Sequence, residues 1–314
     1  MVPAHDDSTT SALAGADALT DAVLTWFGSH ARDLPWRSAG CTAWGVLVSE
    51  IMLQQTPVVR VEPAWRAWMA RWPRPVDLAE ASTADVLRAW DRLGYPRRAL
   101  RLQECARAIV DVHAGRVPDT EEALVALPGI GPYTAAAVVA FAYRRRSVVL
   151  DTNVRRVIAR VVDGEALPAP TLTAGERRRA DALTPRDDAR SAAWAAASME
   201  LGALVCTARS PRCDACPVAA LCRWRTDGYP GDAHAHRRRT QPWTGTDRQA
   251  RGRIMAELRA ADHPVPEPEL ARVWPDHVQR ARALDGLVDD GLVRREVSVV
   301  PDGDPAPPLV SLPR

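Results

Sequence analysis

Leu127-Pro-Gly-Ile-Gly-Pro-Tyr-Thr134 lies between two segments whose apolar residues recur with helical spacing. Two glycines separated by one residue allow a tight turn that exposes backbone amides. The helix that follows adds the positive end of its dipole, so the turn can seat a phosphate group. Taken alone, the same stretch also fits an ordinary turn between two helices.

An aspartate follows this turn about twenty residues downstream, in Val149-Leu-Asp-Thr-Asn-Val-Arg-Arg156. Asp151 comes after an apolar run and before a predicted helix, so it is a candidate N-cap. It can also serve as a functional carboxylate, and the two roles are compatible. The L-P-G-x-G pattern upstream is that of the helix–hairpin–helix, a motif that binds a DNA backbone without regard to base sequence.

Four cysteines form the pattern C-x6-C-x2-C-x5-C between Cys206 and Cys222. Four thiolates within 17 residues can surround zinc or an iron–sulfur cluster, and the spacing alone does not separate the two. Paired disulfides are the alternative, and they suit small secreted domains. The N-terminus shows no basic region followed by an apolar core, so we predict no signal peptide and favour ligation.

The composition predicts a soluble, cytoplasmic protein of one large or two modest domains. Of its 314 residues 46% are hydrophobic, yet no apolar run reaches the roughly 20 residues that cross a bilayer. The formal net charge is +2; residues 244–314 hold ten arginines and twelve acidic residues, or −2, which leaves +4 for residues 1–243. All 41 basic residues are arginine, so no side-chain amine can form a Schiff base.

Basic residues also cluster locally, and such clusters suit either phosphate contacts or a solvated face. They are Arg144–Arg146, Arg155, Arg156, Arg160 and Arg237–Arg239.

The periodicity predicts a mostly α-helical chain to about residue 204, without convincing strands. Residues 1–16 are small, polar and aperiodic, and we expect them to be disordered. Predicted helices include 17–28, 83–93, 97–114 and 134–143. Residues 226–247 are predicted to be a linker. Three further helices (251–261, 267–274, 277–291) and two short strands (Arg294–Val300, Pro308–Pro313) resemble a winged-helix module, although its charge argues against assuming that it binds DNA.

The order of hairpin, aspartate and four cysteines resembles the helix–hairpin–helix DNA glycosylases that carry a [4Fe–4S] cluster, over residues 20–225. The resemblance implies a mainly α fold with a helical barrel at about 37–148 and a cluster domain from 17–36 and 149–225. A linker (226–247) and a winged-helix-like module (248–314) would follow. The implied cluster ligands are Cys206, Cys213, Cys216 and Cys222.

Three local features resemble the A/G-specific adenine glycosylases within that superfamily. Ser49-Glu-Ile-Met-Leu-Gln-Gln-Thr56 places Glu50 at the family's catalytic acid, and Leu34-Pro-Trp-Arg37 matches a motif just upstream. Tyr133 stands where the endonuclease III group has its lyase lysine. Each residue has a plainer interpretation: Glu50 on a solvated helix face, and Trp36 and Tyr133 in packing.

The resemblance implies a monomeric enzyme that acts on double-stranded DNA containing adenine opposite 8-oxoguanine or guanine, without a lysine-dependent lyase. Glu50 would protonate the departing adenine, which requires an apolar pocket that raises its pKa. Ionised Asp151 would stabilise the cationic sugar, and Tyr133 would hydrogen-bond in the site. Implied DNA contacts are Gln55 and Tyr95 as wedges between bases, with Leu93, Thr56, Gly129 and Gly131. The implied adenine pocket comprises Trp36, Arg37, Leu53 and Val58.

The implied cluster is structural, and it holds the loop Thr207–Arg212 so that Arg209 and Arg212 reach phosphates. The chain departs from the family in two places: Pro96 replaces a second tyrosine, and residues 248–314 are too short for a domain that resembles Nudix hydrolases. Cys41 and Cys105 are interpreted as packing thiols and Glu200 as structural.

Three other functions fit parts of the sequence. A thymine or uracil mismatch glycosylase keeps the fold and changes the base. A cluster-bearing DNA-binding or damage-sensing protein binds mismatches without releasing a base. An endonuclease III-like lyase is disfavoured because the chain has no lysine.

Overall fold

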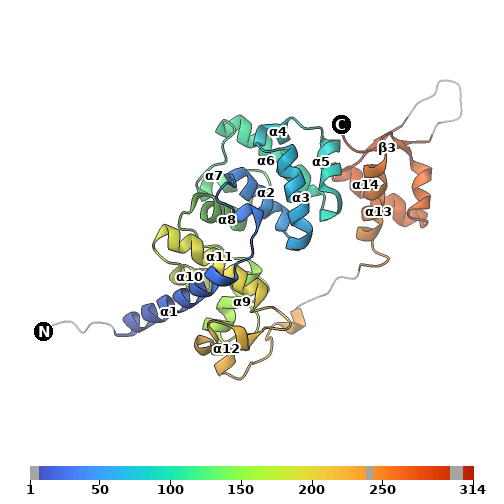
Figure 1. Ribbon diagram of the computed structural model, residues 1–314. Helices are drawn as coiled ribbons and strands as arrows, with labels where there is room; N and C mark the ends of the chain where they lie inside the picture. Colours follow the sequence, from blue (N-terminus) through green and yellow to red (C-terminus); the bar gives the residue numbers. More distant parts are fainter. Residues whose placement is uncertain (1–6, 238–242, 298–306) are drawn as a thin grey trace, which may run out of the picture. The chain divides into compact units, whose positions relative to one another are not determined.

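The computed structural model describes residues 7–237, 243–297 and 307–314 (Figure 1). The chain forms two compact units. One unit comprises residues 1–43, 119–122 and 131–239, and the other comprises residues 44–118, 123–130 and 240–314. Within the described part of the chain, every helix is too short or too polar to cross a membrane.

The first unit consists of helices, and two of them, α1 and α11, pack against each other. Its elements are α1 (Asp7–His30), η1 (Pro35–Arg37), α8 (Pro132–Tyr143), α9 (Thr152–Ile158), η3 (Ala159–Asp163), α10 (Ala174–Leu183), α11 (Asp188–Leu204), η4 (Cys213–Ala215), η5 (Ala219–Leu221), α12 (Arg223–Thr226) and η6 (Ala235–Arg237).

Helix α1 begins at Asp7, whereas the sequence predicted disorder through residue 16. The misleading feature was the lack of apolar periodicity before Asp17. Alanines at positions 12, 14 and 16 nevertheless have the highest helix propensity, which favours a helix that begins before Asp17. Residues 1–6 lie outside the described residues.

The core of this unit forms where the apolar stripe of α1 meets α11. Leu19, Val23 and Trp26 recur at helical spacing and pack with Trp194 and Leu201. The same cluster includes Cys206 and Cys222, so the core of the unit continues directly into the cysteine segment.

The second unit holds the remaining helices and a small sheet. Its helices are α2 (Ala43–Leu53), α3 (Val58–Arg71), α4 (Pro75–Ala79), α5 (Thr83–Trp90), η2 (Asp91–Leu93), α6 (Arg97–His113), α13 (Asp247–Ala260), η7 (Glu267–Arg272) and α14 (His277–Asp289). Helix α7 (Glu121–Val125) has residues in both units. Trp68 meets Trp72 and Trp90 edge-on in the core of the second unit, at centroid distances of 4.6 and 5.6 Å.

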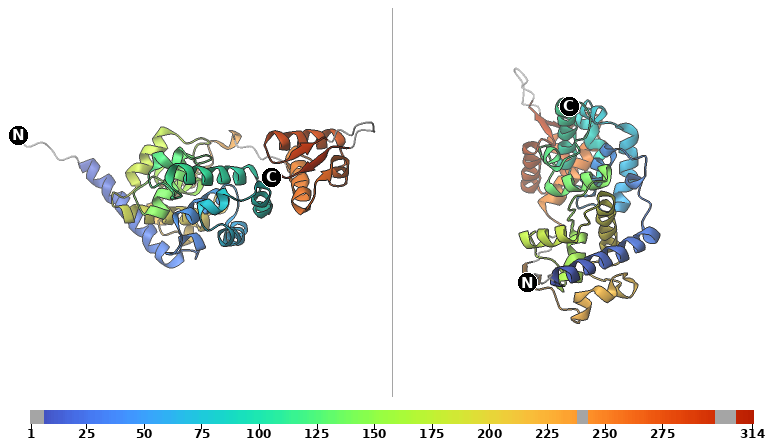
Figure 2. Two further views of the ribbon diagram at one scale, coloured as in Figure 1. Left: turned by 90° about the horizontal axis from the view of Figure 1, so that it is seen from above. Right: turned by 90° about the vertical axis from the view of Figure 1, so that its left-hand side faces the viewer.

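Three strands accompany α13 and α14 in the C-terminal part (Figure 2). They are β1 (Val265–Pro266), β2 (Arg294–Glu296) and β3 (Leu309–Ser311). Both neighbours run antiparallel to the central β3, with Val310 opposite Val265 and Arg295. The winged-helix-like arrangement of helices followed by paired strands is therefore present.

Two details of this part differ from the sequence prediction. The middle helix is a 3-10 helix that ends at Arg272, because Trp274 precedes Pro275 and is disfavoured in the helical region. A third strand, β1, is added; its Val265 and Pro266 are flanked by further prolines that hide a strand pattern. Residues 298–300 of the predicted strand lie outside the described residues.

The division into units also differs from the predicted domains. Helix α8, assigned from sequence to the barrel, belongs to the unit that contains the cysteines. The C-terminal part belongs to the unit that contains α2 to α6.

Candidate functional site

The hairpin forms as a tight turn between α7 and α8. Gly129 has φ +77°, and a Cβ there would lie 2.8 Å from the Cβ of Arg101, so backbone conformation and space both require glycine. Gly131 has an ordinary φ of −95° and precedes Pro132 in the first turn of α8. The Ile130 amide donates to the Leu127 carbonyl at 3.2 Å and closes the turn.

Glu50 lies in the middle of α2, and its residue is only 5% exposed. Every residue of this helix from Trp44 to Met52 is buried, so a solvated helix face is the wrong interpretation. The indoles of Trp65 and Trp44 fix the start of the helix, donating to the carbonyls of Gly45 and Trp72 at 2.8 and 3.1 Å. The carboxyl group of Glu50 is therefore largely removed from water.

The two predicted wedge residues lie in two turns that touch each other. The Thr56 hydroxyl donates to the Leu93 carbonyl at 2.9 Å, which joins the turn after α2 to the turn before α6. Gln55 directly precedes Thr56, and Tyr95 lies two residues after Leu93. Both residues are exposed. Both have positive φ, 56° and 47°. Leu53 and Val58, assigned to the adenine pocket, flank the first turn and are half-buried.

Asp151 is the N-cap of α9, which confirms the capping role predicted from the sequence. Its carboxylate accepts from the Asn153 and Val154 amides at 2.9 and 2.7 Å and from the Asn153 side-chain amide at 2.7 Å. Burial raises the pKa of Asp151, and these hydrogen bonds oppose that effect only in part. The carboxylate is therefore held in one orientation at a cost in desolvation.

Tyr133 lies in the first turn of α8 and packs against the buried cluster that contains Ala136, Ala137 and Val149. Trp36 is buried in η1. Arg37 donates to Glu200 at 3.0 Å and lies over the ring of Phe27.

Glu200 is fully buried and also receives two hydrogen bonds from the Arg32 guanidinium, at 2.7 and 2.8 Å, and one from the Arg32 backbone amide at 2.9 Å. The predicted site residues are divided between the two units. One unit contains Glu50, Gln55, Thr56, Leu93, Tyr95 and Gly129, and the other contains Asp151, Tyr133, Gly131, Trp36 and Arg37.

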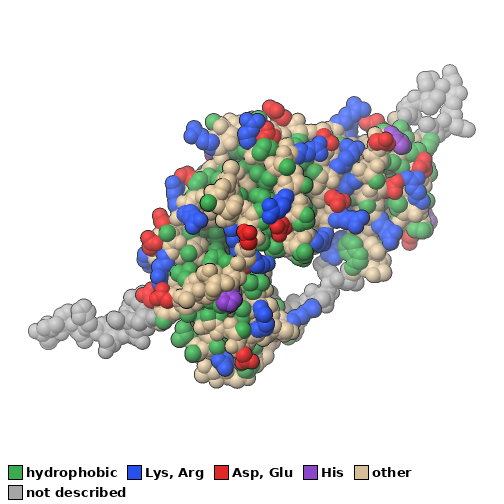
Figure 3. Space-filling model, in the orientation of Figure 1, with side chains coloured by type: hydrophobic (Ala, Val, Ile, Leu, Met, Phe, Trp, Pro, Cys, Tyr) green, Lys and Arg blue, Asp and Glu red, His purple; other side chains and the backbone are tan. Residues whose placement is uncertain are grey.

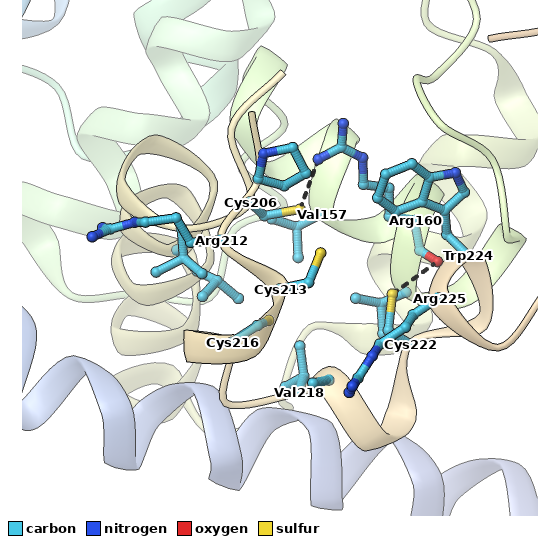
Figure 4. A pocket seen from close by; sticks show the side chains of 15 residues that line it. Val157, Arg160, Cys206, Arg212, Cys213, Cys216, Val218, Cys222, Trp224 and Arg225 are labelled. Atoms are coloured by element: carbon cyan, nitrogen blue, oxygen red, sulfur yellow. Dashed lines mark hydrogen bonds between the residues drawn. The ribbon is translucent and has the colours of Figure 1, made fainter. Parts of the chain in front are cut away.

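The four predicted ligands line one pocket, shown in Figure 4. All six cysteines of the chain carry free thiols, which overturns the disulfide alternative. Burial, and to a smaller extent the neighbouring cysteines, raises the pKa of Cys216 to about 11. Four crowded sulfur donors therefore suit a cation that stabilises their thiolate form, as the iron of a cluster held by four cysteines does.

Two arginines brace this pocket. Arg160 donates to the Cys206 sulfur at 3.3 Å and to the Thr207 carbonyl at 2.8 Å, and it stacks on Trp224 at 4.4 Å. Arg156 donates to the carbonyls of Cys206 and Gly202, each at 2.7 Å. Both side chains are buried, so their assignment to phosphate contacts or a solvated face is wrong.

Most of the other predicted phosphate contacts in these clusters are also engaged within the protein. Arg155 pairs with Glu176, Arg146 with Asp181 and Arg145 with Asp119. Arg237 lies at the end of η6, and Arg238 and Arg239 lie outside the described residues. In the cysteine loop, Arg212 donates to the Leu204 carbonyl at 2.6 Å.

Sequence reasoning missed Arg98 and the braces Arg156 and Arg160. One signal was present: Arg156 and Arg160 are four residues apart, on the same helical face as the core. A cationic side chain at such a position is normally buried only with partners.

Two family models match the chain. Residues 48–178 match the HhH-GPD superfamily of base excision DNA repair proteins, and residues 206–222 match the iron–sulfur binding domain of endonuclease III. Adenine DNA glycosylase from Mycobacterium tuberculosis (strain CDC 1551 / Oshkosh) is 53% identical over 278 residues, which are 88% of this chain and 90% of the relative.

The chain belongs to the adenine DNA glycosylase family. The Mycolicibacterium smegmatis adenine DNA glycosylase is 52% identical over 87% of this chain and 92% of its own. Like the family, the protein is a DNA N-glycosylase of base excision repair that binds DNA and carries a [4Fe–4S] cluster. The predicted identity, fold and cofactor are thus confirmed.

The solved structures agree on the fold. A thermostable thymine-DNA glycosylase has a TM-score of 0.61 at 26% identity, covering 68% of this chain and 97% of that one. An endonuclease III in a non-covalent DNA complex has a TM-score of 0.58 at 20% identity over the same shares.

Proposed function

We propose that this adenine DNA glycosylase hydrolyses the N-glycosidic bond of adenine opposite 8-oxoguanine or guanine in duplex DNA, as a monomer and without lyase activity. The observation that carries the proposal is the buried carboxyl of Glu50 within the motif Ser49–Thr56. The high identity to relatives named adenine DNA glycosylase supports the choice of base.

Glu50 acts as the general acid in this proposal. Adenine is a poor leaving group as an anion, and a proton on a ring nitrogen lets it depart as a neutral base. This step needs the proton-carrying form of Glu50, and the burial of the residue supports that requirement. Such catalysis contributes roughly 10²–10⁴-fold. The resulting carboxylate then accepts a proton from the attacking water.

Asp151 stabilises the sugar as positive charge develops on it. The three hydrogen bonds that it accepts hold its carboxylate in place before the reaction, so little reorganisation is needed when the cation forms. Tyr133, in the first turn of α8, hydrogen-bonds within the site. A glutamate acid paired with an ionised aspartate parallels the two-carboxylate chemistry of glycoside hydrolysis.

The remaining residues position the DNA. Gly129 and Gly131 present the hairpin amides and the N-terminus of α8 to a phosphate. Gln55 and Tyr95 enter the base stack with Leu93 and Thr56 beside them, which offsets part of the few kcal/mol needed to unstack a base. Trp36, Arg37, Leu53 and Val58 contact the adenine base in this proposal. The cluster is structural and supports the loop Thr207–Arg212.

The deciding experiment is strand cleavage of duplexes with one central adenine opposite 8-oxoguanine or guanine, scored with and without alkali. We expect breaks only on the adenine strand and only after alkali, because no lysine is present to form an imine. Glu50→Gln should abolish base release while retaining DNA binding. Efficient borohydride trapping at a side chain would contradict the monofunctional assignment, and sedimentation would check the monomer.

One observation favours a second candidate, a thymine or uracil mismatch glycosylase. The 26% identical structural neighbour is a thymine-DNA glycosylase. Duplexes with T·G and U·G pairs therefore accompany the adenine duplexes. Cleavage of these pairs without adenine release would establish this candidate in place of the first.

A further inference from the structure

Two exposed residues, Gln55 and Tyr95, have left-handed backbone conformations, with φ of 56° and 47°. Gln55 lies between α2 and α3, and Tyr95 lies between η2 and α6. A non-glycine residue in this region is strained, because its Cβ lies too close to the backbone. Surrounding contacts must therefore hold both turns in this form.

Arg98, in the first turn of α6, makes those contacts. Its Nη1 and Nη2 groups donate to six oxygens that come from both turns. The Nη1 acceptors are the carbonyls of Ile51 (2.8 Å), Met52 (3.0 Å) and Gln54 (2.6 Å). The Nη2 acceptors are the Thr56 hydroxyl (2.9 Å) and the carbonyls of Leu93 (3.0 Å) and Gly94 (3.0 Å).

The two terminal nitrogens of Arg98 bind different parts of the chain. Nη1 binds the C-terminal end of α2, whose last carbonyls lack partners within the helix. Nη2 binds the link between Thr56 and Leu93, where the two turns meet. One planar guanidinium thus spans both turns, and a lysine ammonium, with its donors on one nitrogen, cannot reproduce this geometry.

None of the six acceptors is a carboxylate. Burial lowers the pKa of Arg98 to about 10, so the group remains cationic at neutral pH without an ionic partner among these acceptors. Its Nε is buried and has no hydrogen-bond partner, and its guanidinium lies 5.1 Å from the Trp90 ring. These hydrogen bonds fix the position of the guanidinium, although burying its charge costs desolvation free energy.

We propose that Arg98 is a positioning residue that joins the turns of Gln55 and Tyr95 into one rigid pair, so that both side chains enter the duplex together. Arg98 itself touches no reacting atom. The inference rests on the proposed function, because the wedge roles of Gln55 and Tyr95 belong to it. Without the contacts of Arg98, either turn would lose the backbone conformation that directs Gln55 or Tyr95 into the duplex. The general electrostatic attraction between the protein and DNA phosphates would persist.

The test is Arg98→Lys in the full-length holoenzyme, with Arg97→Lys as the matched control. Arg97 is the next residue, exposed, and pairs with Asp290 at 3.1 Å. We expect Arg98→Lys to fold and to bind matched duplex like wild type. Its preference for an A:8-oxoguanine duplex over an A:T duplex should fall at least tenfold, and 2-aminopurine at the target position should lose its fluorescence increase. Arg97→Lys should match wild type in all three.

A double-mutant cycle separates positioning from general support. When Gln55→Ala and Tyr95→Ala are both present, adding Arg98→Lys should cost less than twofold in discrimination, because the side chains that it positions are gone. A full tenfold loss on that background would overturn the proposal. So would wild-type discrimination by Arg98→Lys alone, or an equal loss of matched-duplex binding.

If Arg98→Lys fails to fold, Thr56→Val decides. It keeps the shape of the side chain and removes the hydroxyl that connects Arg98 to Leu93. A several-fold loss of discrimination supports the proposal, and an unchanged value overturns it. Wild-type protein that releases no adenine opposite 8-oxoguanine would refute the proposed function instead, so the two failures are distinguishable.

Discussion

Two acidic residues of one unit show how local partners determine a carboxyl group's pKa. Asp151 is buried with amide donors, and its pKa is raised. Burial also acts to raise the pKa of Glu200, but hydrogen bonds from Arg32 and Arg37 outweigh it and lower the pKa to about 2. Neutral donors orient a carboxylate, whereas guanidinium partners also stabilise its charge.

This difference predicts the behaviour of Asp151→Asn. A raised pKa means that ionising Asp151 costs more in the folded than in the unfolded protein, so its contribution to stability falls as pH rises above its ordinary value. The neutral asparagine avoids that cost and can still cap α9. We expect a melting temperature at pH 7 no lower than wild type, with base release reduced about 10²–10³-fold.

The matched control for that prediction is Asp187→Asn. Asp187 is also an N-cap aspartate, accepting from the Arg190 amide at 2.8 Å, but it is exposed. Its substitution should leave base release unchanged. Calorimetry and single-turnover kinetics check both variants, and full activity in Asp151→Asn would remove Asp151 from the mechanism.

Glu200 predicts the opposite dependence on pH. Its lowered pKa contributes stability above the ordinary value of 4.5, and this contribution is lost as the pH falls toward 2. Glu200→Gln leaves Arg32 and Arg37 without their buried partner and should cost about 3–5 kcal/mol at neutral pH.

Unfolding of Glu200→Gln at pH 7, 4.5 and 3 should show its deficit shrink with acid. Glu62→Gln, which removes an exposed i,i+4 pair with Arg66, should cost less than about 1 kcal/mol at all three values. A deficit independent of pH would show that the charge of Glu200 is not what stabilises this region.

The structural features that the sequence predicted are those with a local pattern. The gathering of four cysteines around one pocket and the cap role of Asp151 are set by neighbours within a few positions. Arg98 and Arg156 could not be predicted, because their acceptors lie up to 47 and 50 residues away in sequence. The four-residue spacing of Arg156 and Arg160 indicates a shared helical face but not the acceptors of either side chain, and the charge of these two residues favoured the phosphate interpretation.

At the scale of elements, the close approach of α9 and α11 depends on Gly202. A Cβ at this position would lie 2.6 Å from the Cβ of Asn153 and 2.8 Å from its carbonyl oxygen. Asn153 in turn donates to Asp151 at 2.7 Å. The packing of two helices thus determines where a candidate catalytic carboxylate lies.

We therefore expect Gly202→Ala to lower stability by about 2–3 kcal/mol and also to slow base release, because α9 must shift to accommodate the methyl group. Gly252→Ala in α13 is the control: its nearest neighbour is a Trp243 atom at 3.9 Å, so helix propensity should stabilise it by about 0.5–1 kcal/mol. Denaturant unfolding and kinetics measure both. A Gly202→Ala variant with unchanged kinetics would separate helix packing from catalysis.

Elements with strong periodicity were predictable, such as α6 at Arg97–His113 against the predicted 97–114. Elements that depend on other parts of the chain were not. Strand β1 exists because β3, more than forty residues later, pairs with it. Pairing of this kind leaves no local pattern in a two-residue strand.

At the scale of the whole molecule, the C-terminal part neutralises much of its own positive charge. Among its described residues, five arginines pair with carboxylates of the same part: Arg251 with Asp290, Arg272 with Glu257, Arg282 with Asp247, Arg294 with Glu296 and Arg295 with Glu267. Figure 3 shows basic and acidic side chains intermingled on the visible face. With a net charge of −2, this pattern favours packing over phosphate binding.

One arginine of this part instead reaches the barrel helices of its own unit. Arg259 donates to the Asp91 carbonyl at 2.7 Å, and burial lowers its pKa. Asp91 has a strained φ of 37° and begins the segment that leads to Tyr95. Arg88 reciprocates, donating to the Ala261 carbonyl at 3.2 Å.

These contacts predict that Arg259→Ala loosens a turn far from it in sequence. Losing a charge-assisted hydrogen bond should cost about 1.5–3 kcal/mol, and amide hydrogen exchange should accelerate in residues 91–97 while residues 147–225 stay unchanged. Arg253→Ala, an exposed position on the same helix, should change neither region. Equal exchange in both variants would mean that α13 only covers the barrel. Faster exchange confined to 91–97 would mean that the C-terminal part stabilises the segment carrying Tyr95, by contacts unrelated to DNA binding.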